Sequence, residues 1–108
     1  IRMTPIESWL WHDLRAVDVV VYPQYPVAGF FVDFANPKAK VAIECDGEFY
    51  HRDKSKDEMR DSKLRAAGWS VYRITGKDCR DGVGRDGSSA ARNFVERIAS
   101  EHNIKRHA

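Results

Sequence analysis

Aromatic and β-branched residues gather in two short runs near the middle of the chain. The first run is FFVDFA at residues 30–35, and the second is VAIEC at residues 41–45. Between them lie Asn36, Pro37 and Lys38, which are typical of turns. The pattern therefore predicts two neighbouring β-strands joined as a hairpin.

Apolar residues at helical spacing predict three helices around this hairpin. The first helix opens with Thr4 as its cap and Pro5 at its first helical position. Its inner face is formed by Ile6, Leu10, Leu14 and Val17. Two more helices are expected at residues 55–67 and at about 88–102.

The segments that flank these elements are less regular. A β-branched run that begins at Val19 predicts an edge strand or an irregular strand, because Pro23 and Pro26 lack a backbone donor. Residues 76–87 are rich in glycine and charge, which predicts a loop. The polar residues 105–107 predict a frayed tail.

Residues 69–74 alternate in character and predict a fourth strand. It would lie parallel to the strand at 41–45, because the helix at 55–67 connects the two. The predicted fold class is α/β, with a central mixed β-sheet of about four strands flanked by helices in the order α-β-β-β-α-β-α. At this length, residues 1–108 are expected to form a single domain. The start at Ile1, without a methionine, favours a processed protein or a domain excised from a longer one.

Charge is distributed unevenly, although the net charge is only +2. Residues 1–50 hold 4 basic and 7 acidic side chains, whereas residues 51–108 hold 14 and 9. A basic half suits a polyanionic substrate, although lysines and arginines also form solvated helix faces. Without an apolar run of about 18 residues or a leader, we expect a cytoplasmic protein with no membrane partner. Cys45 and Cys79 lack ligand spacing and are expected to be reduced thiols.

Three carboxylates fall on the predicted hairpin. Asp33 interrupts an apolar strand, and Glu44 and Asp46 lie two residues apart, which projects both from one face about 7 Å apart. Crowded ionised acids need a cation, and Mg²⁺ prefers oxygen ligands. The pattern therefore predicts a metal site formed by Asp33, Glu44 and Asp46. In the alternative interpretation these acids face water, and Asp46 with Gly47 only forms a turn.

Other candidate residues surround this predicted metal site. His51 could accept a proton near neutral pH. Glu7 is explained by the capping box of the first helix, and it joins the site only if that helix starts over the hairpin. Phe49 and Tyr50 are either core residues or groups that stack on bases. The basic candidates for DNA contacts are Arg60, Lys63 and Arg73.

The order of these residues resembles the PD-(D/E)xK nuclease superfamily. The resemblance rests on Glu7 in a helix, VDF around Asp33, ECDG at 44–47, His51, DxxR at 57–60, Leu64 and GW at 68–69. Within the superfamily the chain is most similar to the Vsr-like branch: very-short-patch repair endonucleases, DUF559-type proteins and the EDxHD catalytic domain of Vsr-related phage homing endonucleases. The resemblance covers roughly residues 4–75 and implies a restriction-endonuclease-like core.

Carried over by position, the resemblance makes Asp33 the first metal-binding acid, Glu44 the acid of the second motif and His51 the catalytic histidine. Phe49 and Tyr50 fall where Vsr enzymes place aromatics that wedge into DNA. The lysine position of the superfamily holds Asp46 instead. Either the metal and His51 activate water together, or the domain is inactive.

The predicted function is that of a Mg²⁺-dependent DNA endonuclease domain, in which Mn²⁺ can replace Mg²⁺. The resemblance implies the catalytic domain of a homing endonuclease that acts on double-stranded DNA in a bacterial or phage-infected cell. The predicted catalytic residues are Asp33, Glu44, Asp46, His51 and Glu7. Two alternatives stay open: a DNA-binding module that keeps the nuclease fold without catalysis, and a domain whose acids only solubilise its surface.

Overall fold

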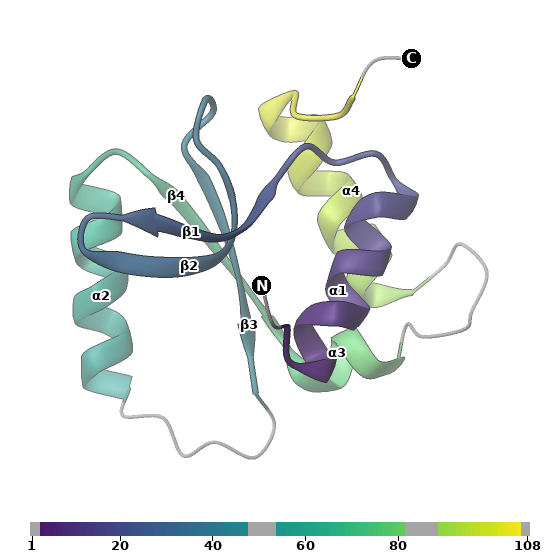
Figure 1. Ribbon diagram of the computed structural model, residues 1–108, viewed down its shortest axis with the longest axis horizontal. Coiled ribbons are helices and arrows are strands. Elements are labelled where there is room, and N and C mark those ends of the chain that lie inside the picture. The colour runs from purple at the N-terminus through teal and green to yellow at the C-terminus, as the bar shows by residue number, and fades with distance from the viewer. Residues whose placement is uncertain (1–2, 48–53, 82–88, 107–108) are drawn as a thin grey trace.

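Four β-strands form one mixed sheet in the computed structural model, which describes residues 3–47, 54–81 and 89–106 (Figure 1). The strands are β1 (Tyr22–Val27), β2 (Phe30–Asn36), β3 (Val41–Asp46) and β4 (Ser70–Thr75), in the spatial order β1-β2-β3-β4. β1 with β2 and β2 with β3 are antiparallel, whereas β3 and β4 are parallel. The predicted hairpin, the edge position of β1 and the parallel fourth strand are confirmed.

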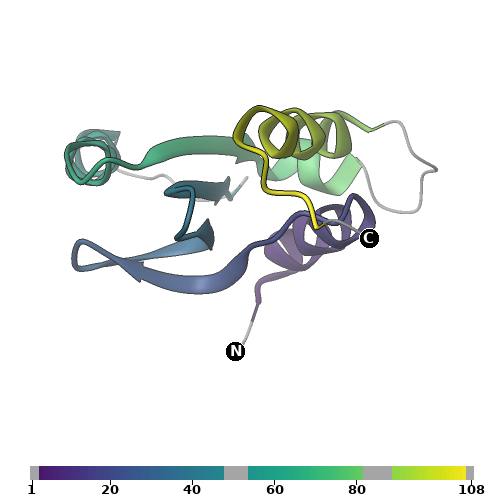
Figure 2. The ribbon, with the colours of Figure 1, turned by 90° about the horizontal axis from the view of Figure 1, so that it is seen from above.

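Helices cover both faces of this sheet. They are α1 (Pro5–Ala16), α2 (Lys54–Ala66), α3 (Gly76–Asp81) and α4 (Ala90–His102). α2 lies on one face, and α1, α3 and α4 pack together on the other (Figure 1). Figure 2 shows α1 and α4 side by side, with α2 across the sheet from them. The predicted α/β fold is confirmed, and among the described residues no helix is both long enough and apolar enough to cross a membrane.

The apolar core has one part on each face of the sheet. The larger part joins α1, α3 and α4 to the sheet through residues that include Leu10, Leu14, Phe34, Ile43, Cys79, Val95 and Ile98. The smaller part lies under α2 and is formed by Val27, Val32, Ala35, Ala42 and Leu64. The sheet is therefore buried on both faces, which explains why β3 reads as a nearly continuous apolar run.

The start of the first strand and the C-terminal tail differ from the sequence-based expectation. β1 begins at Tyr22, whereas Val19 forms an isolated antiparallel bridge with Lys105. The backbone N–H of Arg106 donates to the carbonyl of Asp18 at 2.7 Å. The prediction of a frayed tail is therefore wrong for residues 105 and 106, because their backbone pairs with the segment that follows α1.

A short helix occupies part of the predicted loop. α3 begins at Gly76, and the Oγ1 of Thr75 accepts the backbone N–H of Asp78 at 3.2 Å. Gly76 is buried, and Cys79 is a fully buried member of the core. The glycine and charge content suggested a loop, but one buried cysteine fixes this turn against the core. Residues 82–87 of that prediction lie outside the described residues.

Candidate active site

β2 and β3 separate at the positions of Asp33 and Glu44. Their register ends where Phe34 faces Ile43. Beyond that pair, Oδ2 of Asp33 accepts the backbone N–H of Cys45 at 2.7 Å. Oε2 of Glu44 accepts the backbone N–H of Asp33 at 3.4 Å. Two carboxylates thus take the place of the backbone ladder, and they lie at the gap between the strands.

The alternation of β2 side chains between the two faces of the sheet is interrupted at Asp33. Strict alternation would place Val32 and Phe34 on the same face of the sheet, yet Val32 packs under α2 and Phe34 packs with α1. Across the strand pair, Gln24 has a φ of 52°, in the left-handed region. This local rotation places Asp33 between the two faces of the sheet, within reach of both α1 and β3.

Glu7 reaches Asp33 from the first turn of α1. Its Oε2 accepts the backbone N–H of Thr4 at 2.6 Å as part of a complete capping box, and its Oε1 accepts Nε2 of Gln24 at 2.9 Å. Burial acts to raise the pKa of Glu7, but hydrogen bonds from Thr4 and from the side chains of Asp33 and Gln24 outweigh it, so the pKa is lowered. α1 does start beside the hairpin (Figure 1).

Asp33 has the opposite electrostatic character. Burial, together with the negative charge of Glu44, raises the pKa of Asp33 to about 8, and the hydrogen bond from Cys45 only partly offsets this. At neutral pH the carboxyl of Asp33 therefore holds a proton unless a cation lies beside it. Glu7 and Asp33 form a hydrogen-bonded acid pair in which Glu7 is the more acidic.

Arg60 of α2 supplies positive charge to Glu44. Its Nη2 lies 2.6 Å from Oε1 of Glu44 and donates at 2.6 Å to the carbonyl of Phe31. The carboxyl of Glu44 is almost completely buried, with 3% of its side chain exposed. The approach of Arg60 to Oε1 lies outside hydrogen-bonding geometry, so this oxygen has no hydrogen-bond partner among the described residues.

Asp46 pairs with Arg73, whereas Glu44 pairs with Arg60. Nη1 of Arg73 donates to Oδ1 of Asp46 at 2.7 Å. The same guanidinium donates twice to Asp61 of α2, from Nε at 2.9 Å and from Nη2 at 2.8 Å. The structure therefore brings Glu7, Asp33 and Glu44 together, and it directs Asp46 into an ion-pair network with Arg73 and Asp61.

Asp61 is a buried acid that the sequence-based search for a site did not find. A signal for it was available, because Asp61 lies three residues before Leu64 and so shares the helix face that packs on the sheet. An acid on that face needs a buried partner. Burial acts to raise the pKa of Asp61, but the hydrogen bonds and charge of Arg73 outweigh it and lower the pKa.

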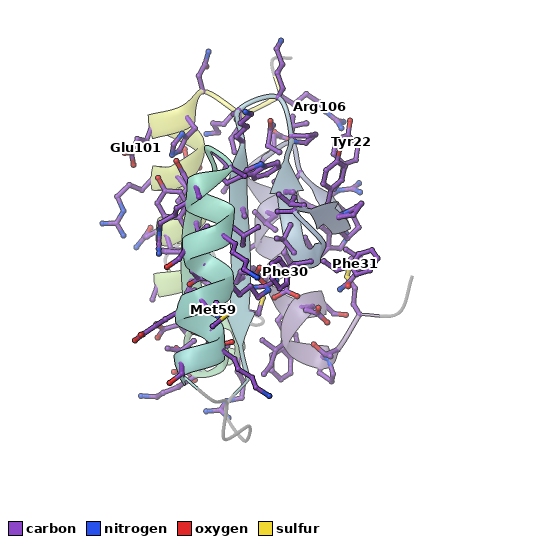
Figure 3. The ribbon with its side chains drawn as sticks, turned by 90° about the vertical axis from the view of Figure 1, so that its left-hand side faces the viewer. Tyr22, Phe30, Phe31, Met59, Glu101 and Arg106 are labelled. Atoms are coloured by element: carbon purple, nitrogen blue, oxygen red, sulfur yellow. The ribbon has the colours of Figure 1, made fainter. Side chains whose placement is uncertain are left out.

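The remaining sequence-predicted site residues fall into two groups. His51, Phe49 and Tyr50 lie outside the described residues. Lys63 is exposed on α2 with its Nζ 5.8 Å from the ring centroid of Phe30, which lies beside α2 (Figure 3). Within the described parts of the chain, no three His, Cys, Asp or Glu side chains are arranged as a group ready to hold a metal ion.

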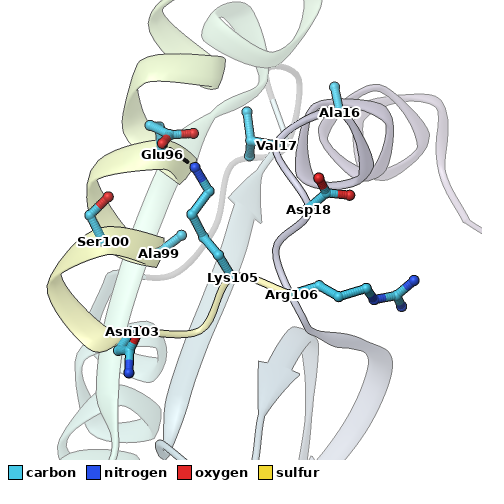
Figure 4. A pocket seen from close by; sticks show the side chains of 9 residues that line it. All are labelled: Ala16, Val17, Asp18, Glu96, Ala99, Ser100, Asn103, Lys105 and Arg106. Carbon is cyan, nitrogen blue, oxygen red and sulfur yellow. Dashed lines mark hydrogen bonds and ion pairs between the residues drawn. The ribbon is translucent and has the colours of Figure 1, made fainter. Parts of the chain in front are cut away.

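A groove of about 690 Å³ lies away from these acids. It runs between the end of α1 and α4, where Asp18, Glu96 and Lys105 line it, with Lys105 paired to Glu96 (Figure 4). Glu7 lies at the other end of α1, about 15 Å away along a helix of this length. The groove therefore does not coincide with the carboxylate site.

Comparison with known proteins adds sequence relatives to this geometry. The restriction-endonuclease-like family model REase_MTES_1575 matches residues 7–84. The uncharacterized protein YcjD of Escherichia coli (strain K12) is 33% identical over 85 residues, which cover 74% of this chain and 73% of YcjD. An uncharacterized protein of Haemophilus influenzae is 30% identical over 77 residues, which cover 67% of this chain and 64% of that protein.

A solved structure shares the fold. The catalytic domain of the homing endonuclease I-Bth0305I superposes with a TM-score of 0.75, covering 93% of this chain and 98% of that chain at 23% identity. The predicted resemblance to PD-(D/E)xK nucleases is confirmed, whereas the assignment to the Vsr-like branch stays a prediction. Since the family model and the E. coli relative each cover more than two thirds of the chain, this protein belongs to the restriction-endonuclease-like family REase_MTES_1575.

Proposed function

We propose that this nuclease-family domain is a DNA endonuclease that uses Mg²⁺, or Mn²⁺ in its place, to hydrolyse phosphodiester bonds. The observation that carries the proposal is the interlocked pair Asp33 and Glu44 at the gap between β2 and β3, with Glu7 beside it. Membership of a restriction-endonuclease-like family supports the reaction class. The fold shared with a homing endonuclease catalytic domain supports DNA as the substrate.

The residues present fit a hard divalent cation. All the side-chain donors are carboxylate oxygens, the ligands that Mg²⁺ prefers. Oε1 of Glu44 is buried without a hydrogen-bond partner among the described residues, and the guanidinium of Arg60 2.6 Å away shows that this oxygen is placed to face a cation. The raised pKa of Asp33 means that a second negative charge beside Glu44 is unfavourable until a cation compensates it. We therefore assign the metal to Asp33 and Glu44, and retain Asp46 as a third candidate ligand.

The chain's own residues then have distinct roles in the proposed reaction. A bound divalent ion would acidify water and stabilise charge on the phosphate. Glu44 and Asp33 would hold the ion, and Glu7, which is hydrogen-bonded to Asp33 while Asp33 carries its proton, would remain beside the site as a further carboxylate. His51 is the proposed proton acceptor, as its place after Asp46 and Gly47 predicts.

The basic residues divide between support of the acids and contact with DNA. Arg60 and Arg73 each pair with site carboxylates, so their charge is largely compensated within the protein. Lys63 is exposed and forms no ion pair within the described part of the chain, which makes it the better candidate for a backbone phosphate. Phosphate contacts of this kind are independent of base sequence.

Plasmid nicking by the purified domain tests the proposal. We expect nicking with Mg²⁺ or Mn²⁺ that is lost with a chelator and in Asp33→Asn and Glu44→Gln. Glu101→Gln removes an exposed acid on α4 and serves as the matched control that keeps full activity. DNA retention without nicking under either metal would instead support the alternative of a non-catalytic binding module.

A further inference from the structure

One guanidinium joins a buried acid of α2 to the end of β3. Arg73 donates from Nε and Nη2 to the two carboxylate oxygens of Asp61, and from Nη1 to Asp46. The side chain of Asp61 is 10% exposed, whereas that of Asp46 is 37% exposed. A bidentate pair of this kind fixes the plane of the guanidinium. The third bond therefore has a defined direction, and it ends at Asp46.

The same helix turn reaches both acids of β3. Arg60 contacts Glu44, and its neighbour Asp61 holds the arginine that contacts Asp46. In the parallel register of β3 and β4, Arg73 lies opposite Glu44, two residues before Asp46. Acidic and basic side chains therefore alternate along this network, in the order Glu44, Arg60, Asp61, Arg73 and Asp46. Each carboxylate of β3 has an arginine beside it that compensates its charge.

We propose that Asp61 and Arg73 are positioning residues, which orient the carboxylate of Asp46 as the third candidate ligand of the proposed divalent ion. The inference rests on the proposed nuclease function, which it deepens by adding two residues that act through Asp46. It also assigns Arg73 a role other than the DNA contact expected from the sequence. Three of its nitrogens already donate to carboxylates within the protein.

Kinetic measurements on variants distinguish a positioning role of Arg73 from direct contact with DNA. If Arg73 positions Asp46, Arg73→Lys and Asp61→Asn lower kcat for nicking about 10- to 100-fold, the usual cost of losing an outer-shell partner. KM for DNA changes little, because lysine keeps the positive charge but not the fork geometry. If Arg73 instead binds a phosphate, Asp61→Asn leaves kcat intact, and Arg73→Gln, which removes the charge, raises KM and reduces the salt dependence of binding. That second result would overturn the proposal.

A buried ion pair elsewhere separates positioning from simple loss of stability. Arg92 of α4 donates from Nε to Oδ1 of Asp13 of α1 at 3.0 Å, and the side chain of Asp13 is 3% exposed. Asp13→Asn breaks a comparable buried pair away from the carboxylate site. We expect Asp13→Asn to lower Tm while nicking below Tm keeps its kcat, and Asp61→Asn to lower both. Equal kcat in the two variants would contradict positioning.

A double-mutant cycle then tests whether Asp61 acts through Asp46. In the background of Asp46→Asn, the further change Asp61→Asn is expected to cost little additional kcat and little additional affinity for Mn²⁺ measured by calorimetry. Losses that multiply would show that Asp61 acts independently, which overturns the inference alone. A parent domain that neither nicks DNA nor binds Mn²⁺ would instead overturn the proposed function, and positioning with it.

Discussion

Asp33 and Glu44 interlock across the gap between β2 and β3. Glu44 accepts the backbone N–H of Asp33, and Asp33 accepts the backbone N–H of Cys45, the residue that follows Glu44. Each carboxylate is therefore held in place by the other's strand. The arrangement places two acids side by side in a buried site, where either a proton or a cation must compensate one of the charges.

The pH dependence of stability is expected to report the proton on Asp33. The pKa of Asp33 is raised to about 8 in the folded domain by burial and by Glu44, against about 4 when unfolded. Between these values the folded chain binds the extra proton, so this group's contribution to stability falls as pH rises. In the presence of a chelator, the Tm of Asp33→Asn should therefore rise relative to the Tm of the parent as the pH increases from 5 to 8. A constant difference would contradict the shifted pKa.

Addition of Mg²⁺ is expected to restore the stability that the parent loses as the pH rises. A cation that binds the ionised pair competes with the proton on Asp33, so affinity rises with pH. The increase in Tm caused by Mg²⁺ should be larger at pH 8 than at pH 6, and it should grow with concentration as binding to the folded state requires. Asp33→Asn and Glu44→Gln should lose the increase. An equal increase in all three proteins would place the ion elsewhere.

Glu7 combines a structural role with a proposed functional one, and two substitutions separate them. Glutamine at this position still completes the capping box with Thr4, whereas alanine does not. Glu7→Ala should destabilise the domain by about 0.5–1.5 kcal/mol, the net contribution of one hydrogen bond, with a smaller loss in Glu7→Gln. Nicking should fall in both, because both lose the acid beside Asp33. Full nicking by Glu7→Gln would restrict Glu7 to capping.

Arg60 and the metal are expected to compete for Glu44. The guanidinium lies 2.6 Å from Oε1, so it compensates the charge that a divalent ion would compensate. Arg60→Gln should lower Tm in chelator, because it leaves a buried carboxylate without its cation. It should also tighten binding of Mn²⁺ in calorimetry by about tenfold, the scale on which neighbouring groups tune metal sites. Weaker binding in the variant would show that Arg60 supports the ion rather than opposing it.

The strands and their order could be predicted because each carries a local signal. The turn at residues 36–38 and the edge-forming Pro23 and Pro26 specified the antiparallel part, and the helix between β3 and β4 required a parallel pairing. α3 could not be predicted in this way. Its sequence, GKDCRD, has one buried cysteine that gains stability only against α1 and α4. Tertiary packing overrode local composition there.

The candidate site could also be predicted only where it depends on local strand geometry. Asp33 and Glu44 lie on paired strands, so strand geometry alone predicted that they would meet. Asp46 shares a face with Glu44, as predicted, but its partner is Arg73, which lies 27 residues further along the chain. Asp61 joins the same network because Arg73 also donates to it. Side-chain networks of this kind depend on contacts between distant segments, and residue spacing does not specify them.

The central claim is that Asp33 and Glu44 hold a divalent ion, and a crystal structure of the domain grown with Mn²⁺ tests it most directly through anomalous scattering. We expect a peak bonded to a carboxylate oxygen of each residue, with Arg60 shifted from Oε1 of Glu44. A peak bonded to neither residue, in a protein that nicks DNA, would show that Asp33 and Glu44 are not the metal ligands.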